Sequence, residues 1–249
     1  MVKWRFGHVV AGLVVALVVS SAAAAFIYAL GGYDLGIQHG RGSDLGRVAG
    51  RVALGEDPRA NEPPISVIAL LQLPLWCGLV GVPWFVAGRS WHKLFVSTGM
   101  SARPVDIPIG LSIGAATQLL IVPLLYVPIF WLFGDLDIAG PARTLASKAH
   151  GSGVILLVLI VGVGAPLVEE LFFRGVVLSA LREKLPQWPA ILVSALIFGF
   201  FHFQLQQFPA LVVFGVVNAW LTVRFDRLGP AIFSHIAFNM VTVVTLLAA

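Results

Sequence analysis

Charged side chains are scarce in this sequence. Asp, Glu, Lys and Arg make up 11% of the 249 residues, whereas hydrophobic residues make up 58%. Because soluble domains carry about 25% charged residues, this composition excludes an ordinary soluble fold. The net charge of only +4 gives no basis for expecting nucleic acid as a partner.

Cysteine is scarcer still, since Cys77 is alone in the chain. One thiol excludes both a disulfide framework and a metal site made of several thiolates within one chain. Cys77 lies in an apolar run, so we expect it to pack against other helices. We expect no cofactor.

Long apolar stretches are abundant. About 20 apolar residues span a bilayer as a helix, and we count about seven such windows. The expected fold is therefore all-α, a polytopic transmembrane helical bundle of about seven (six to eight) spans that forms one integral membrane domain over 1–249. The windows cover 9–30, 65–87, 107–133, 154–181, 189–205, 207–224 and 230–248.

The N-terminal apolar segment has features of a secretory signal, with Lys3 and Arg5 before it and alanines at 22–25. Its apolar run continues to Leu30, a span-sized length that favours an uncleaved first helix. Residues 31–64 are polar and end in two prolines, so we expect a loop with room for a short surface helix.

Lys and Arg are unevenly divided between the two sets of connections. An inside N-terminus places nine of them on the cytoplasmic side and six on the other side. Because cytoplasmic loops carry the basic excess, we expect the N-terminus inside and the C-terminus outside. The expected location is the cell membrane of a bacterium or archaeon. The cytoplasmic set is Lys3, Arg5, Arg89, Lys93, Arg103, Arg182, Lys184, Arg224 and Arg227.

The first three spans contain few polar side chains. Gln72 lies in the second span, and Thr117 and Gln118 lie in the third beside Gly110 and Gly114. Small residues four apart let helix backbones approach, and amides in membranes hydrogen-bond to neighbouring helices. We therefore expect helix packing, and not chemistry, at these positions.

Three charges lie inside the fourth window, where Glu169, Glu170 and Arg174 are flanked by apolar sequence. An ionisable group at the bilayer centre costs about 2.5–3.5 kcal/mol on insertion scales, so such groups are usually functional and partnered. Glu170 and Arg174 are four residues apart on one helix face and should pair. Glu169 is rotated from Glu170 by about 100° and is left free for another task. A capping salt bridge at the membrane edge is the structural alternative.

Neutral polar side chains occupy later spans at helical spacing. His202 follows Phe198 by one turn, and Asn239 follows His235 by one turn. At about 1.5 Å per residue, Glu169 and His202 lie roughly 18 and 20 Å from the predicted inner ends of their spans. Asn239 and His235 lie roughly 14 and 8 Å from theirs. These depths predict one site in the cytoplasmic half of the membrane.

Such a set of groups suits amide hydrolysis. A carboxylate and a histidine can hold and deprotonate a water, while a second histidine and an asparagine can donate to an oxyanion. The motifs His-Glu-x-x-His, Gly-x-Gly-Asp and Gly-x-Ser-x-Gly are absent from the sequence. Their absence disfavours a standard zinc, aspartyl or serine hydrolase.

Three motifs in order resemble those of the CPBP family, which comprises CAAX prenyl proteases and bacteriocin-processing enzymes and is also called Abi. They are Glu-Glu-x-x-x-Arg at 169–174, Phe-x-x-x-His at 198–202 and His-x-x-x-Asn at 235–239. Each motif is short, but their order in successive spans is specific. The resemblance covers residues 154–249.

The resemblance implies a metal-independent, glutamate-type intramembrane endopeptidase. Its expected partners are the lipid bilayer and a membrane-associated or lipid-modified peptide or protein substrate. By similarity, Glu169 and His202 activate the water, and His235 and Asn239 form the oxyanion hole. Glu170 and Arg174 match motif positions and would support Glu169.

Two other functions remain open. Two histidines and two glutamates could ligate zinc in a membrane hydrolase, although an arginine beside a cation is unfavourable. A scaffold or transporter would use the same charges as a helix-locking network or a proton relay. The sequence has no evident inverted repeat, which argues mildly against a transporter.

Overall fold

The computed structural model describes residues 2–31, 33, 62–134 and 136–248, and these residues form helices and connections without a strand. Within them, six helical stretches are long and apolar enough to cross a membrane. The chain is therefore an integral membrane protein, and the predicted all-α class is confirmed. The polar loop expected at 31–64 lies almost entirely outside the described residues.

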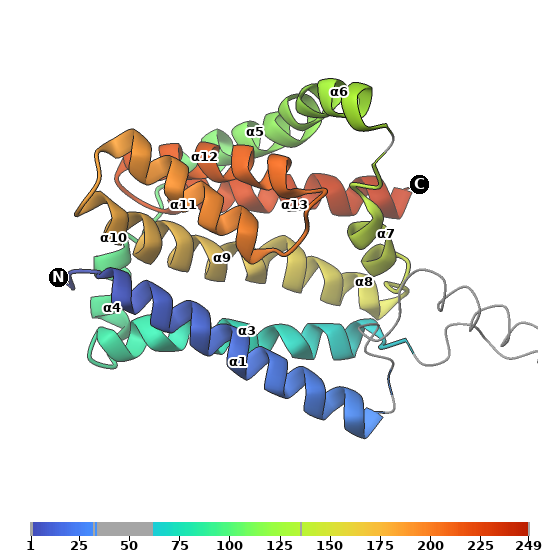
Figure 1. The fold of residues 1–249 in the computed structure, drawn as a ribbon, viewed down its shortest axis with the longest axis horizontal. Coiled ribbons are helices and arrows are strands. Elements are labelled where there is room, and N and C mark those ends of the chain that lie inside the picture. Colours follow the sequence, from blue (N-terminus) through green and yellow to red (C-terminus); the bar gives the residue numbers. More distant parts are fainter. Residues whose placement is uncertain (1, 32, 34–61, 135, 249) are drawn as a thin grey trace, which may run out of the picture.

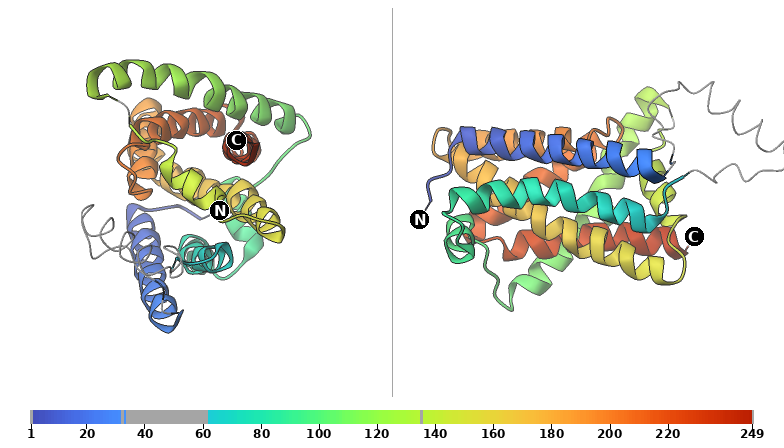
Figure 2. Two further views of the ribbon diagram at one scale, coloured as in Figure 1. Left: turned by 90° about the vertical axis from the view of Figure 1, so that its right-hand side faces the viewer. Right: turned by 90° about the horizontal axis from the view of Figure 1, so that it is seen from below.

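Helices α1 (Phe6–Gly31) and α3 (Ile65–Val86) pack side by side along one face of the bundle (Figures 1 and 2). Close approach requires a small residue, since a Cβ atom at Gly78 would collide with the backbone of Ala16. Cys77 is exposed, which corrects the expectation that it packs inside. It is rotated by about 100° from Gly78, which faces α1, and so lies on a different face of the helix.

The third stretch runs through α5 (Asp106–Ala116), the π-helix η1 (Thr117–Ile121) and α6 (Val122–Phe133). Its first part packs against α13 (Gly229–Ala248). A Cβ at Gly110 would lie 2.6 Å from the carbonyl oxygen of Pro230, and one at Gly114 would collide with the carbonyl oxygen of Ser234. The predicted packing role of both glycines is confirmed.

The helical stretch from Ser152 to Arg182 runs through the middle of the bundle, between the α1–α3 pair and the later helices (Figures 1 and 2). All nine residues of its segment η3 are buried, which is consistent with this central place. Two of its parts have π-helical rather than α-helical hydrogen bonding. In order, its parts are α8 (Ser152–Leu157), η2 (Val158–Gly164, π), α9 (Ala165–Glu169), η3 (Glu170–Leu178, π) and α10 (Ser179–Arg182).

The predicted fifth span, 189–205, is shorter than expected. Helix α11 (Gln187–Phe201) has 15 residues, about 22 Å at 1.5 Å per residue, whereas the hydrocarbon core is about 30 Å thick. The helix ends because Phe203 adopts a left-handed conformation with φ 53°. The chain then turns through residues 204–207, three of which are glutamines, before α12 (Phe208–Phe225) begins.

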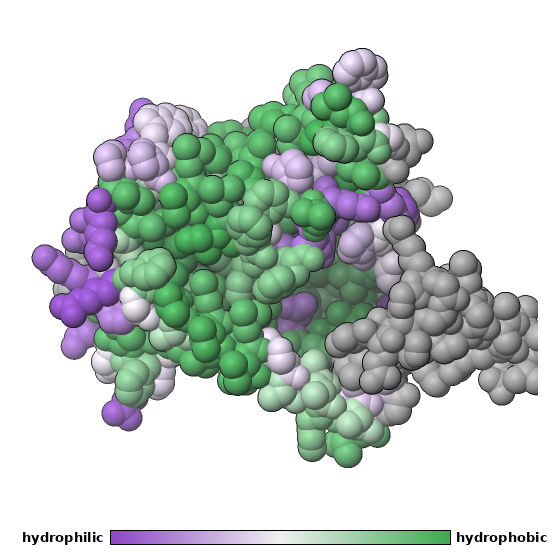
Figure 3. Space-filling model, in the orientation of Figure 1, coloured by the Kyte–Doolittle hydropathy of each residue, from purple (hydrophilic) through white to green (hydrophobic). Residues whose placement is uncertain are grey.

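Polar residues gather at one end of the molecule and apolar residues cover its middle (Figure 3). That polar end carries the N-terminus, α4 (Trp91–Thr98) and α10 (Figure 1). The indole Nε1 of Trp4 donates to the carbonyl oxygen of Ser97 at 2.9 Å and ties the N-terminus to α4. The C-terminus lies at the opposite end, near α7 (Gly140–Ala146) and α8 (Figure 1).

Candidate active site

A cavity of about 380 Å³ opens between the central helix and α13. Four of the predicted site residues line it, namely Glu169, His202, His235 and Asn239. They come from α9, the C-terminal end of α11, and α13. The predicted convergence of these side chains is therefore present in the fold, whereas Glu170 and Arg174 lie behind the cavity wall.

Glu169 faces two imidazole rings. Its Oε2 atom lies 3.7 Å from Nε2 of His202 and 3.8 Å from Nε2 of His235. This oxygen is buried and has no hydrogen-bond partner among the described residues. Both distances exceed hydrogen-bonding range, so one small polar group could contact all three atoms.

His202 is oriented by the last turn of α11. Its Nδ1 lies 2.8 Å from the carbonyl oxygen of Phe198, which only accepts, so Nδ1 carries the hydrogen. The other nitrogen, Nε2, faces Glu169 and is an acceptor when the ring is neutral. The ring of Phe198 packs edge-on against the imidazole at 4.6 Å between centroids and explains the sequence spacing of the two residues.

Glu170 lies at the centre of a buried polar network. Its Oε1 accepts from Nδ2 of Asn218 at 3.0 Å, lies 2.7 Å from Nδ1 of His235, and pairs with an Arg174 nitrogen at 3.1 Å. The predicted pairing of Glu170 with Arg174 is present. The side chains of Glu170 and Arg174 are 0% and 1% exposed, so this charge pair is held away from solvent.

Arg174 and Asn218 hold this network in place. The Arg174 guanidinium also donates to the carbonyl oxygen of Gly215 at 3.4 Å and lies over the ring of Phe198 at 4.3 Å. Asn218 was missed by sequence reasoning. The signal that could have found it is a lone amide inside the apolar run of α12, where a polar group needs a partner.

Asn239 and His235 line the cavity from α13. The amide nitrogen of Asn239 donates to the carbonyl oxygen of Val161 in η2 at 2.8 Å, which uses one of its two hydrogens. The His235 ring packs against Phe214 at 4.9 Å between centroids, and Phe214 stacks on Phe238 at 4.1 Å. Aromatic packing thus fixes the ring whose Nε2 faces Glu169.

Four glutamines also line the cavity, among them Gln72 and Gln118, for which a packing role was expected. The others are Gln204 and Gln207, from the segment between α11 and α12. Gln207 donates through Nε2 to the carbonyl oxygen of Ile138 at 2.8 Å. The Oε1 atoms of Gln118 and Gln204 are buried without a hydrogen-bond partner in the part of the chain that the structure describes.

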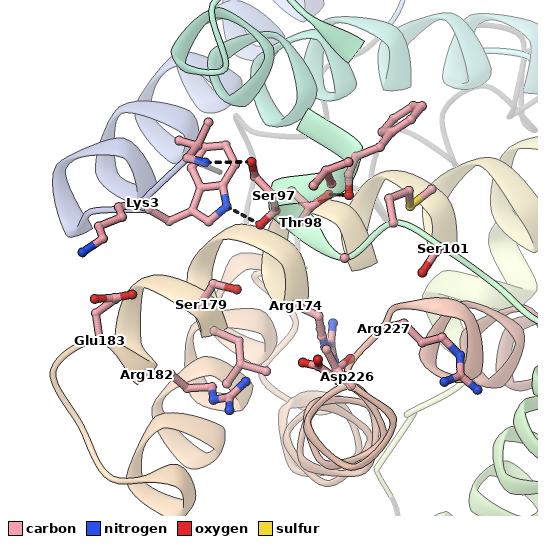
Figure 4. Close-up of a pocket in the computed structure, with 18 of the residues that line it drawn as sticks. Lys3, Ser97, Thr98, Ser101, Arg174, Ser179, Arg182, Glu183, Asp226 and Arg227 are labelled. Atoms are coloured by element: carbon pink, nitrogen blue, oxygen red, sulfur yellow. Dashed lines mark hydrogen bonds between the residues drawn. The ribbon is translucent and has the colours of Figure 1, made fainter. Parts of the chain in front are cut away.

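A second, more polar pocket of about 700 Å³ lies at the end that carries the N-terminus (Figure 4). Lys3, Arg182 and Arg227 line it, and so does Arg174, but the pocket contains neither Glu169 nor the histidines of the first cavity. Arg227 is bonded to Asp106 at 2.5 Å, and this pairing raises the pKa of Arg227. Because the convergent acid and imidazole groups lie elsewhere, the smaller cavity is the candidate active site.

Within the described residues, no group of three or more His, Cys, Asp and Glu side chains is arranged to hold a metal ion. Glu170 already interacts with three nitrogen groups through Oε1, one of them a guanidinium. This arrangement suits a cation poorly. Metal independence nevertheless remains a prediction.

Residues 151–241 match the family described as type II CAAX prenyl endopeptidase, Rce1-like. Over this segment the chain is similar to the CAAX prenyl endopeptidases. The family predicted from the three motifs is thereby confirmed, since all three lie inside the matched segment. The comparison assigns no role to individual residues.

A curated relative is similar over part of the chain. "Putative membrane peptidase YdiL" of Bacillus subtilis (strain 168) is 32% identical over 91 residues, which are 36% of this chain and 37% of that protein. The match thus spans little more than a third of the relative's length. No solved structure matches the chain significantly.

Proposed function

We propose that this protein is an intramembrane endopeptidase that hydrolyses a peptide bond of a membrane-associated or lipid-modified substrate. One observation carries the proposal. Two imidazole Nε2 atoms lie within 3.8 Å of the same Glu169 oxygen, at the wall of a cavity inside the membrane-spanning bundle. The family of residues 151–241 agrees with this reaction class.

Glu169 and His202 activate the water. A water held between Oε2 of Glu169 and Nε2 of His202 loses a proton to one of these bases as its oxygen attacks the peptide carbonyl carbon. The tetrahedral intermediate then collapses, the carbon–nitrogen bond breaks, and the leaving nitrogen receives the same proton. The products are a carboxyl group and an amine, so no further reactant is needed.

His235 and Asn239 stabilise the oxyanion. Nδ1 of His235 gives its hydrogen bond to the Glu170 carboxylate, so Nε2 can donate only when the ring is protonated. The protonated ring would donate to Glu170 through Nδ1 and to the oxyanion through Nε2. Asn239 retains a second amide hydrogen beside the one bonded to Val161.

Glu170, Arg174 and Asn218 act as positioning residues. Their hydrogen bonds and ion pair join the central helix to α12, and His235 joins the same carboxylate from α13. A fixed His235 ring keeps Nε2 directed at the cavity. Apolar side chains form most of the remaining cavity lining and suit an apolar segment of a membrane peptide.

The first test is loss of cleavage in Glu169→Gln and His202→Ala. The probe is a farnesylated CAAX-type peptide with a fluorophore and a quencher on opposite sides of the scissile region, added to protein in liposomes. We expect at least about a hundred-fold lower rate in both variants, because acid–base catalysis contributes about 10²–10⁴-fold. Their thermal unfolding temperatures should stay close to that of the wild type.

Glu183→Gln is the matched control, since Glu183 is an exposed carboxylate outside the cavity. In parallel, membrane peptides that accumulate in cells with wild-type protein are compared with those in cells with Glu169→Gln. Retained cleavage in Glu169→Gln would contradict the assignment. A wild type that cleaves neither the probe nor any cellular peptide would favour a scaffold or transporter.

A further inference from the structure

The carboxamides of the candidate cavity come from separate parts of the chain. Gln118 lies on η1, and Gln204 lies in the segment that follows α11. Both line the same cavity as Glu169 and His202. Carboxamides are therefore part of the site wall and are not confined to helix contacts.

Two hydrogen bonds connect the parts of the chain that surround these carboxamides. The Tyr126 hydroxyl on α6 donates to the carbonyl oxygen of Gln206 at 2.5 Å, and Gln207 donates to the carbonyl oxygen of Ile138. The segment that carries Gln204 is thereby fixed to the helix that continues from Gln118. The backbone segments that carry the two carboxamides are therefore in place before a ligand enters.

Gln118 and Gln204 have unused hydrogen-bonding capacity. Their Oε1 atoms are buried and unpaired within the described residues, whereas Gln207 uses its amide to hold the fold. A buried carbonyl without a donor is unfavourable, so a ligand that brings a donor gains affinity. If either amide were turned over, the buried group would be an unpaired N–H₂, and the ligand would have to accept instead.

A peptide main chain supplies the matching groups. When a peptide is extended for cleavage inside a membrane, its N–H and C=O groups lose helical partners and find no bulk water. A carboxamide offers one acceptor and two donors without a net charge, so it can pair with a peptide group. Resting on the proposed function, we propose that Gln118 and Gln204 bind the substrate main chain beside the scissile bond.

Binding through the main chain predicts that the affinity for a substrate depends little on its side chains. Main-chain groups are common to all peptides, and most of the cavity lining apart from the polar groups is apolar. Selection among peptides then comes from apolar fit and from the ability of the segment to become extended. A substrate lacking one main-chain N–H should bind more weakly to the wild type.

The test combines protein and substrate changes. Gln118→Met and Gln204→Met keep side-chain length but remove the amide, and Gln206→Met is the control because that side chain is exposed and outside the cavity lining. The fluorogenic farnesylated peptide is made with single N-methyl groups at successive main-chain nitrogens. Each Met variant at 118 or 204 should raise KM about 3- to 10-fold, with a smaller change in kcat.

The decisive measurement is the energetic coupling between each N-methyl group on the substrate and each Gln→Met change in the protein. The N-methyl group that weakens binding to the wild type should have no further effect in the variant whose amide it faces. The unfolding temperatures of Gln118→Met and Gln204→Met should not fall, since neither Oε1 atom has a partner to lose. Unchanged KM in both variants, or additive N-methyl effects, would overturn main-chain binding.

Binding measured without cleavage distinguishes failure of the proposed function from failure of this inference. Fluorescence anisotropy reports affinity for the same peptide, without its quencher, in the Glu169→Gln protein with and without the Met changes. Weaker binding in the Met variants, with no cleavage by the wild type, would keep the inference and overturn the peptidase. Absence of binding by every protein would overturn both.

Discussion

Glu170 is the side chain that connects most of the candidate site. One of its oxygens contacts Arg174, Asn218 and His235, and the residue is fully buried. Its neighbour Glu169 is free of hydrogen bonds at Oε2 within the described residues. The two adjacent glutamates therefore differ because one is held by nitrogen donors and the other faces a cavity.

Replacing Arg174 should reduce both stability and activity. Arg174→Met leaves the buried Glu170 carboxylate without its countercharge, and breaking a buried ion pair costs about 3–5 kcal/mol. Thermal unfolding in detergent should show a clear drop, and peptide cleavage should be lost. Arg182→Met changes an exposed arginine on the same helical stretch and should alter neither quantity.

The double variant Glu170→Gln with Arg174→Met separates the effect of an unpaired buried charge from the effect of losing the contact between Glu170 and His235. No unpaired charge remains, so much of the unfolding temperature should return. Activity should stay low because His235 has lost its carboxylate partner. An unfolding temperature for Arg174→Met equal to that of the wild type would show that the pair contributes nothing.

Chelators test the alternative that these residues bind a catalytic zinc ion. We expect EDTA and 1,10-phenanthroline to leave cleavage unchanged, because Glu170 already interacts with the Arg174 guanidinium and the His235 imidazole. Metal analysis of the purified protein should find less than stoichiometric zinc. Activity that is lost on chelation and restored by zinc would replace the glutamate mechanism with a metal-dependent one.

At the scale of elements, the short helix α11 decides where His202 lies. The helix ends at Phe201, so the imidazole occupies the first position after a helix end inside the bundle. The π-helical segments η2 and η3 flank Glu169 on the central helix. Such segments are rare and are frequently found at functional sites, which agrees with their place beside this cavity.

The contact between α5 and α13 should be sensitive to one methyl group. Gly114→Ala places Cβ onto the carbonyl oxygen of Ser234, the residue before His235, so the helices must separate and the site must shift. We expect destabilisation of about 1–3 kcal/mol, typical of overpacking, and a marked loss of cleavage.

Gly81→Ala is the matched control in another membrane helix, where an added Cβ meets nothing within 4 Å. It should be neutral or slightly stabilising, by up to about 1 kcal/mol, because alanine favours helix more than glycine does. Unfolding temperature and cleavage rate check both variants. Equal behaviour of the two would mean that the α5–α13 distance does not control the site.

For the whole molecule, the distribution of basic residues predicts the orientation in the membrane. The predicted inside set of basic residues includes Lys3, Lys93 and Lys184, and the ends of α1, α4 and α10 near them lie together in the fold (Figure 1). The positive-inside rule predicts that this end lies in the cytoplasm. The candidate cavity would then lie between that end and the outer one.

Single cysteines test this orientation in a Cys77→Ala background. Lys184→Cys lies at the end that carries the N-terminus, and Thr144→Cys lies at the other end, both at exposed positions. A membrane-impermeant maleimide added to intact cells should label Thr144→Cys, and should label Lys184→Cys only after permeabilisation. The reverse pattern would place the N-terminus outside.

The all-α membrane class, the family resemblance and the six motif residues from Glu169 to Asn239 could be predicted from the sequence alone. Lipid makes each buried polar side chain expensive, so these residues stand out against an apolar background. The same logic paired Glu170 with Arg174, because a helix brings residues four apart onto one face. Gly110 and Gly114 were likewise identified as packing residues by their spacing.

The long-range partners of each polar group depend on how the helices pack and could not be predicted from the sequence. Asn218 reaches Glu170 because α12 packs against the central helix, and no local spacing in the sequence encodes that contact. Gln118 and Gln204 face the cavity because η1 and the turn after α11 meet there, whereas Cys77 faces outward. Helix periodicity fixes which residues share a face, but the direction of that face depends on how all the helices pack together.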